Sequence, residues 1–236
     1  MIDDFSILAV IPARGGSKGI HKKNLRLVNG ESLLALTIKN ARASKYIDRI
    51  IVSSEDNEIL DEAKRVGAEI PFIRPSHLAE DETPGIDPVM HAIEQINQYD
   101  YTLLLQVTSP LRAADDIDGC IEHCCQHKAP ACVSINETRE HPHLMFTIND
   151  HQKTLTPLFS IKKAARRQDL PSIYIINGAI YFAKTNWLKS NKTFITNETI
   201  GYVMPQERSL DIDSEFDFLI LEAYQNKKNQ YTKVAI

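Results

Sequence analysis

The amino-acid sequence predicts an α/β protein built on a doubly wound, mostly parallel sheet. Short, continuous apolar runs, for example at 6–12 and 102–107, are typical of strands that are buried on both faces. Segments with helical periodicity lie between these runs. Strand and helix alternate repeatedly, and right-handed crossovers between parallel strands are the usual solution for such an order.

The expected elements follow one another along the first half of the chain. We expect strands at 6–12, 49–53, 69–73, 102–107 and 131–135, and helices at 32–43, 58–66, 87–97 and 114–127. Ser32 stands where an N-cap of the first helix belongs, and Gly67 is placed to end the second. Each strand is thus followed by a helix or a polar loop before the next strand.

The second half of the chain departs from this alternation. From 136 to 171, short apolar pieces such as 144–148 lie between polar turns, which predicts an inserted β-rich arm. Strand-like runs return at 173–182 and 199–204. Ser214 is placed to cap a last helix that reaches about residue 224, and we expect the polar residues after it to fray.

Composition restricts the classes of function. Of the 236 residues, 43% are hydrophobic and 25% charged, as in an ordinary globular protein, and the length fits one domain with a small appendage. The net charge of −4 argues against a nucleic-acid partner. No apolar run is long enough to span a membrane and no secretory signal is visible, so we expect a cytoplasmic protein without a membrane partner.

The four cysteines lie close together, between Cys120 and Cys132, which suits a reducing compartment. Cys120, His123, Cys124 and His127 could share one helix face and hold a metal ion. No second ligand pair with suitable spacing follows, so packing of small sulfur side chains is the favoured interpretation.

A basic glycine loop follows the first expected strand, at residues 13–19. Its glycines allow a ligand to approach the backbone and allow positive φ, so that successive N–H groups could form an anion-binding nest. Five cations fall within thirteen positions: Arg14, Lys18, Lys22, Lys23 and Arg26. The spacing fits neither G-x-G-x-x-G nor a P-loop. A triphosphate is the expected ligand; a tight solvated turn is the alternative.

Asp211 and Asp213 form a second polar feature near the end of the chain. If they lie on a strand, both project to one side and offer oxygen ligands to Mg²⁺. The alternative is a solvated acidic turn that caps the last helix.

Residues 11–19 (IPARGGSKG) with Lys23 and Asn24 resemble the signature of the acylneuraminate cytidylyltransferases, the CMP-sialic acid synthetases. Similar segments follow in the family's order at 50–54, 72–75, 106–112, 167–171, 177–181 and 211–213. The resemblance covers nearly the whole chain. It implies a Rossmann-like fold of the nucleotide-diphospho-sugar transferase type, a single domain over 1–236, with a dimerisation arm at 136–171 and a homodimer.

The resemblance also implies a reaction, in which CMP passes from CTP to the anomeric hydroxyl of a nine-carbon acidic sugar and pyrophosphate is released. The nucleotide-binding residues would be Arg14, Gly16, Ser17, Lys23, Asn24 and Arg74. Among them, Lys23 and Arg14 would be catalytic, and Arg74 would help to recognise cytosine unless it is a surface arginine. Asp211 and Asp213 would hold the Mg²⁺ cofactor, with Asp211 a possible base.

On the sugar side, the resemblance points to Gln106, Arg167, Asn177, Tyr181 and Phe194. Arg167 is expected to reach the site of a neighbouring subunit, and Tyr181 could instead be a core aromatic residue. Ile175 stands where many bacterial sialic acid enzymes have an arginine, and Leu144 and Met145 are apolar where a basic residue is expected.

These apolar positions leave the sugar open between a sialic acid and a legionaminic or pseudaminic acid, because an apolar side chain matches a deoxy position better than a hydroxyl. Two alternatives remain open: a synthetase for the eight-carbon acid Kdo, and a non-catalytic nucleotide-binding module of the same fold.

Overall fold

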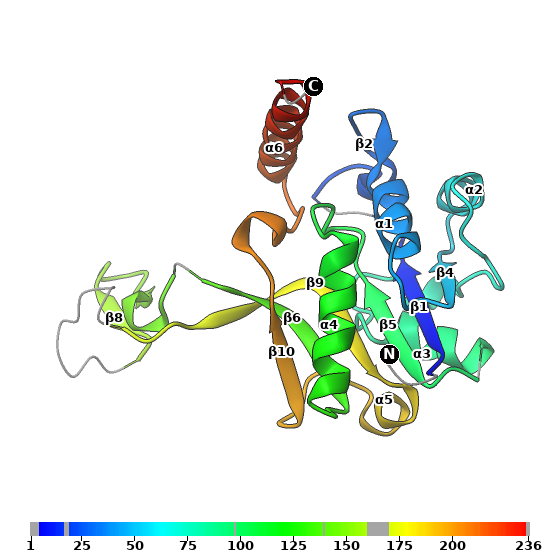
Figure 1. Ribbon diagram of the computed structural model, residues 1–236. Coiled ribbons are helices and arrows are strands. Elements are labelled where there is room, and N and C mark those ends of the chain that lie inside the picture. The colour runs from blue at the N-terminus through cyan, green and yellow to red at the C-terminus, as the bar shows by residue number, and fades with distance from the viewer. Residues whose placement is uncertain (1–4, 17–18, 97, 139, 160–169, 235–236) are drawn as a thin grey trace.

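The computed structural model is built on a six-stranded sheet with the order β10–β6–β9–β5–β1–β4 (Figure 1). It describes residues 5–16, 19–96, 98–138, 140–159 and 170–234, with side chains up to 227. All of the sheet's strands run parallel except β9, which is antiparallel to both β5 and β6. The predicted α/β architecture with a mostly parallel sheet is confirmed.

The first half of the chain follows the predicted alternation closely. Its elements are β1 (Ile7–Pro12), the short hairpin β2 (Leu27–Val28) and β3 (Glu31–Ser32), α1 (Leu33–Arg42), β4 (Arg49–Ser53), α2 (Asn57–Arg65), α3 (Asp87–Gln95), β5 (Tyr101–Leu105), α4 (Ala114–Gln126) and β6 (Ala131–Glu137). The Ser32 hydroxyl accepts a hydrogen bond from Ala35 N at 3.0 Å, so the predicted N-cap of α1 is confirmed.

The strand expected at 69–73 does not form. Glu69 makes only an isolated parallel bridge to Ile51 of β4. Pro71 follows two residues later and has no N–H with which to continue a ladder. The ladder therefore stops after one residue, and β4 is left as the last strand of the sheet.

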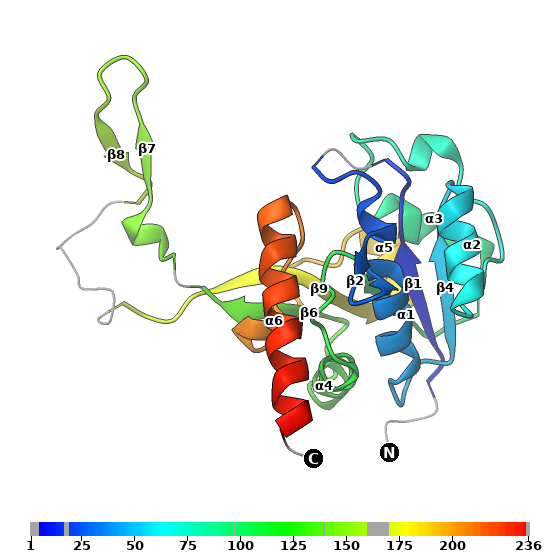
Figure 2. The same cartoon turned by 90° about the horizontal axis from the view of Figure 1, so that it is seen from above.

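The second half contains the arm and the antiparallel strand. The hairpin of β7 (Phe146–Ile148) and β8 (Leu155–Pro157) lies within the expected insert and projects from the body of the molecule beyond the ends of β6 and β9 (Figure 2). The elements that follow are β9 (Tyr174–Lys184), α5 (Thr185–Asn191), β10 (Thr199–Val203) and α6 (Glu215–Val234).

The expected boundaries of these last elements were partly wrong. The helix α5 was not anticipated, and α6 continues to Val234, ten residues beyond the expected end and through the segment expected to fray. Ser214 does cap α6, because its hydroxyl accepts a hydrogen bond from Asp217 N at 3.4 Å. Among the described residues, no helix is both long and apolar enough to cross a lipid bilayer.

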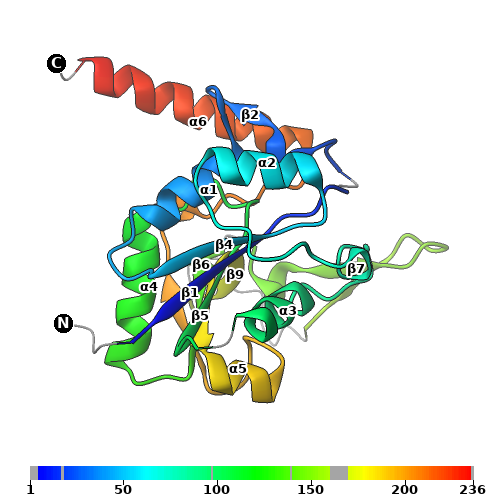
Figure 3. The same ribbon diagram turned by 90° about the vertical axis from the view of Figure 1, so that its right-hand side faces the viewer.

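Two layers of helix cover the sheet (Figure 3). One face packs against α1 and α4, with Leu33, Ile38, Ile117 and Ile121 fully buried. The opposite face packs against α3 and α5 through smaller apolar clusters. The loops at the carboxyl ends of the parallel strands remain uncovered by these layers, and a ligand crevice belongs at that edge of an open α/β sheet.

The cysteines contribute to the first of these cores. Cys120, Cys124 and Cys132 are buried, and Cys120 Sγ lies 3.6 Å from Cys132 Sγ. Burial raises the pKa of the Cys124 thiol to about 12. These contacts are those of small apolar side chains that pack between α4 and β6.

Candidate functional site

Two neighbouring pockets open at the carboxyl edge of the parallel strands. The first has a volume of about 380 Å³ and the second about 560 Å³, and Gln106, directly after β5, lines both. The first contains every described residue that was predicted to bind the nucleotide: Arg14, Gly16, Lys23, Asn24 and Arg74. The second is lined by three of the predicted sugar-side residues, Gln106, Asn177 and Tyr181, and by Asp211, which was predicted as a metal ligand.

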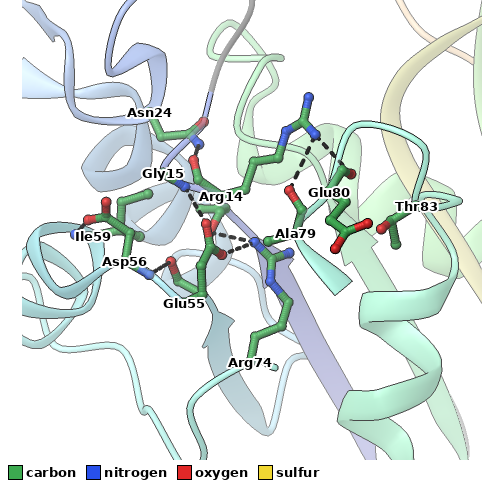
Figure 4. A network of polar contacts seen from close by, with 12 residues as sticks. Arg14, Gly15, Asn24, Glu55, Asp56, Ile59, Arg74, Ala79, Glu80 and Thr83 are labelled. Atoms are coloured by element: carbon green, nitrogen blue, oxygen red, sulfur yellow. Dashed lines mark hydrogen bonds and ion pairs between the residues drawn. The ribbon is translucent and has the colours of Figure 1, made fainter. Parts of the chain in front are cut away.

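The glycine loop after β1 forms one wall of the first pocket (Figure 4). Gly15 N donates a hydrogen bond to Glu55 Oε1 at 2.8 Å, and Asn24 Nδ2 donates to Arg14 O at 2.9 Å. The expectation of positive φ in this loop is wrong for its described glycines. Gly19 is required for close approach instead, because a Cβ there would lie 2.5 Å from Asp213 O.

Arg74 lies in the floor of the first pocket and is only 3% exposed, so it is not a surface arginine. One NH2 group donates to Glu55 Oε2 at 2.5 Å and to Ala13 O at 3.2 Å. Its Nε is buried without a hydrogen-bond partner among the described residues. An unsatisfied donor of this kind is costly in a free protein, and a ligand oxygen could satisfy it.

Glu55, directly after β4, was not among the predicted residues. Its two carboxylate oxygens join the glycine loop to Arg74. It was missed because it does not contact the pocket itself, although its place at the carboxyl end of a parallel strand was a usable signal.

Arg14 spans the first pocket from the glycine loop to the segment that follows Leu78. Its NH1 group donates to Glu80 O at 3.1 Å (Figure 4). Its NH2 group lies 2.9 Å from Asp81 Oδ1. These partners are backbone and carboxylate oxygens. A phosphate would compete for the same guanidinium donors, since its charged oxygens can accept two parallel hydrogen bonds from the planar guanidinium group.

Lys23 connects the glycine loop to the acidic segment. Its Nζ donates to Ile212 O at 2.6 Å and to Asp213 Oδ1 at 3.2 Å, and its side chain is 15% exposed. By contrast, the neighbouring Lys22 points to Glu58 of α2, with Nζ 2.6 Å from a carboxylate oxygen. Only one of the two adjacent lysines therefore faces the site.

The two aspartates lie in a segment without helix or strand, so the expected strand geometry is wrong. Ile212 between them is buried, and its N–H donates to Thr108 O at 2.9 Å. Asp211 lines the second pocket, whereas the Asp213 side chain is 77% exposed and contacts Lys23.

Asp211 has the chemistry of a cation ligand. Its Oδ1 is buried without a hydrogen-bond partner among the described residues. Burial raises the pKa of the Asp211 carboxyl, and the Asp213 charge adds to this. A hard divalent cation would satisfy the orphan oxygen, and two carboxylates completed by phosphate oxygens and water suit Mg²⁺. The donors present therefore fit that ion.

The second pocket is shaped by a network around Asn177 of β9. Ser134 Oγ donates to Asn177 Oδ1 at 2.6 Å, and Asn177 Nδ2 donates to Ser209 Oγ at 2.9 Å. Gly178 follows with φ +75°, and a Cβ there would crowd Gln106 Oε1 at 3.2 Å. The Asn177 amide is thus engaged within the protein, where it joins β6, β9 and the segment after β10.

Tyr181 and Phe194 take different positions relative to this pocket. Tyr181 lines it, and burial raises the pKa of its hydroxyl, with a further contribution from the Asp211 charge. Phe194 is buried with its ring centre 5.5 Å from that of Tyr181, and it lies outside the pocket lining. Phe194 therefore packs against the Tyr181 ring without lining the pocket itself. Ser17 and Arg167 lie outside the described residues.

Arg112 is a further residue that the predictions omitted. It is fully buried, and its NH1 group donates to Gln106 O at 3.0 Å and to Ala179 O at 2.7 Å. It thereby ties the end of β5 to β9, the two strands whose residues line the second pocket. Nothing in the sequence pattern distinguishes it from an exposed arginine.

The fold and the paired pockets are those of an α/β protein with a ligand crevice at the carboxyl edge of its sheet. Comparison with known proteins identifies the class further: a sequence model of the cytidylyltransferase family matches residues 8–231, and the chain belongs to that family.

Curated relatives cover most of the chain. It is 34% identical to the CMP-N,N'-diacetyllegionaminic acid synthase of Legionella pneumophila, over 92% of this chain and 94% of that protein. It is 33% identical to the pseudaminic acid cytidylyltransferase of Campylobacter jejuni, over 89% and 92%. It is 32% identical to the N-acylneuraminate cytidylyltransferase of Streptococcus agalactiae, over 90% of this chain but only 51% of that protein.

Solved structures share the architecture. The structure of a CMP:2-keto-3-deoxy-manno-octonic acid synthetase complexed with CTP aligns with a TM-score of 0.71 at 13% identity, covering 94% of this chain and 99% of that one. At such identity the likeness concerns the fold alone.

Proposed function

We propose that this protein transfers CMP from CTP to the anomeric hydroxyl of a nine-carbon acidic sugar and releases pyrophosphate. The observation that carries the proposal is the pair of pockets that meet at Gln106, with Lys23 reaching the acidic segment between them. One pocket offers cations for a triphosphate, and the other offers amide, hydroxyl and carboxylate groups for a polyhydroxylated substrate. The names of its relatives support the same reaction.

In this reaction, the sugar hydroxyl oxygen forms a bond to the α-phosphorus while the bond from that phosphorus to the bridging oxygen breaks. Negative charge grows on the phosphate oxygens, so positioning and electrostatic stabilisation carry most of the catalysis. Lys23, Arg14 and Arg74 are the described lysines and arginines that line the first pocket, and we assign Lys23 and Arg14 to the phosphates. Arg74 lies deeper, and its unsatisfied Nε suits an oxygen of the cytosine ring.

Asp211 and Asp213 would hold Mg²⁺. The ion, when bound, neutralises charge on the phosphate oxygens and makes a nearby hydroxyl more acidic. Asp211 contributes an otherwise unpaired buried oxygen to this site, which supports the assignment. Asp211 also lines the second pocket, and we propose that its carboxylate accepts the proton of the sugar hydroxyl.

The second pocket favours a particular sugar. Ile175 and Ile176 of β9 present apolar side chains to it, and its described lining contains no lysine or arginine. An apolar wall suits the methyl groups of deoxy carbons and N-acyl substituents better than a hydroxylated tail. We therefore propose a legionaminic- or pseudaminic-type acid. Arg167, outside the described residues, is our proposed partner for the sugar carboxylate.

Pyrophosphate release tests the proposed function. The protein is incubated with CTP and Mg²⁺ together with a neuraminic, legionaminic or pseudaminic acid, or with Kdo. We expect turnover with nine-carbon acids and the highest kcat/KM with a legionaminic or pseudaminic acid. Turnover with Kdo alone would identify the eight-carbon alternative, and no turnover with any acid would favour a non-catalytic nucleotide-binding module.

We also propose that the protein works as a homodimer. The β7–β8 hairpin exposes apolar side chains that a monomer leaves in water, namely those of Phe146, Ile148 and Leu155 with the adjoining Leu144, Met145, Leu158 and Phe159. Such a projecting apolar surface is typical of an association site. A twofold partner would cover the arm and bring Arg167 to a neighbouring pocket.

A further inference from the structure

A bidentate ion pair between a fully buried carboxylate and a partly exposed guanidinium, whose side chain is 34% exposed, joins α4 to the segment that carries Asp211. Asp116, in the first turn of α4, has no exposed surface. Arg208 Nε lies 2.8 Å from Asp116 Oδ2, and Arg208 NH2 lies 2.8 Å from Oδ1. Two parallel hydrogen bonds between planar groups fix orientation as well as distance.

Arg208 stands directly before the acidic segment, residues 209–213, and further contacts hold the other parts of that segment. Ser209 Oγ accepts from Asn177 Nδ2, and Ile212 N donates to Thr108 O, both at 2.9 Å. Asp211 between them has a buried oxygen without a described partner. The ion pair is therefore the anchor at the start of the segment, and Ile212, which is buried and accepts a hydrogen bond from Lys23 Nζ, is the anchor in its middle.

Asp116 interacts with more than one group near the second pocket. Its Oδ2 also accepts a hydrogen bond from Ala113 N at 2.9 Å, which secures the beginning of α4. Burial lowers the pKa of Arg112 to about 10, and the Asp116 charge partly opposes this. Arg112 in turn links the ends of β5 and β9. The buried Asp116 carboxylate thus favours the charged form of Arg112, after β5, and holds Arg208, before the acidic segment.

We propose that Asp116 and Arg208 are positioning residues, whose bidentate pair holds residues 209–213 where Asp211 faces the second pocket and Asp213 faces Lys23. Neither residue lines a pocket, so the pair acts through the segment and not by touching a substrate. The inference rests on the proposed function and deepens it. It assigns the placement of the two proposed magnesium ligands to a contact that lies outside both pockets.

Arg208→Lys in the full-length protein tests the proposal, since lysine keeps the charge but loses the second parallel bond. Arg65→Lys is the matched control, because Arg65 forms the same bidentate pair with Glu62 on α2, with bonds of 2.7 and 2.9 Å, outside both pockets. We expect Arg208→Lys to lower kcat by about tenfold or more, to raise the half-saturating Mg²⁺ concentration, and to leave KM for CTP within about twofold. Arg65→Lys should change none of these.

Hydrogen exchange supplies a readout that does not depend on turnover. Arg208→Lys should speed exchange of the Ile212 amide, which is bonded to Thr108 O, while amides of β1 and α2 stay protected. Unchanged exchange at Ile212, or equal acceleration throughout the molecule, would overturn the proposal. If the wild-type protein turns over no sugar, the proposed function fails, and the exchange result still decides whether the pair positions the segment.

Asp116→Asn is the second variant, because its amide oxygen can still accept from Ala113 N while the charge is lost. We expect the same pattern of kinetic and exchange changes, and a double variant no worse than the more affected single variant, since both remove one interaction. Effects that simply multiply would show that the two residues act separately and would overturn the proposal.

Discussion

At the scale of single residues, the site depends on which of two adjacent lysines faces the pockets. Lys23 Nζ reaches the Ile212 carbonyl oxygen and the Asp213 carboxylate, whereas Lys22 pairs with Glu58 on α2. Charge and spacing alone do not separate them, because both lie in one polar loop; the resemblance to the acylneuraminate cytidylyltransferases pointed to Lys23. The left-handed backbone at Lys22, with φ 49°, turns the chain between the two side chains.

Replacing Lys23 by methionine should lower kcat by about 100-fold or more, because a preorganised cation beside the phosphates would be lost. KM for CTP should change much less. Steady-state kinetics with CTP and a nine-carbon acid measures both quantities. Lys22→Met is the matched control and should leave kcat unchanged, with a loss of stability within about 1 kcal/mol for an exposed ion pair. Equal effects of the two substitutions would contradict the assignment of Lys23.

The residues that the sequence pattern missed share one property. Glu55, Arg112, Asp116 and Arg208 all act on other protein groups and not on a ligand. Charged residues are mostly exposed, so a single sequence does not mark those that bond to other protein groups, apart from the position of Glu55 directly after a strand. By contrast, an anion site in the loop after β1 could be predicted because loops after parallel strands meet at one edge of the sheet, and the family resemblance then pointed to Arg14, Lys23 and Asn24.

At the scale of elements, the regular strands of the first half were predictable from their apolar runs, and the exceptions have local causes. Pro71 ends the expected strand at 69–73 after a single bridge. The direction of β9 could not be read from its sequence, because an alternating or apolar run has the same period in either direction. The length of α6 was underestimated because polarity near a chain end does not by itself end a helix.

The exposed apolar side chains of the β7–β8 hairpin can be tested by substitution. In β7, Phe146 and Ile148 share one side of the hairpin and Thr147 lies on the other. Ile148→Asp should raise the dissociation constant of the proposed dimer by at least about tenfold, because a charge would be placed in an apolar interface. Thr147→Asp is the control and should have little effect. Light scattering across a dilution series measures both, and a fully active wild-type monomer would contradict the proposed dimer.

At the scale of the whole molecule, the fold brings four distant segments to one edge: the glycine loop, the segment around Arg74, the end of β5, and the acidic segment after β10. The central sheet fixes their distances, and Gly19 packs on the Asp213 backbone so that the first and last of these segments touch. The protein's proposed activity therefore belongs to the arrangement and not to any one motif.

Transfer of label from [α-³²P]CTP tests this account most directly. The protein is incubated with Mg²⁺, a legionaminic or pseudaminic acid and CTP labelled in turn at the α- and the γ-phosphate. We predict that α-label appears in a CMP-sugar and γ-label in pyrophosphate, in equal amounts. CTP that binds but stays intact, or label that reaches no sugar, would contradict the proposal that the two pockets join a nucleotide to an acidic sugar.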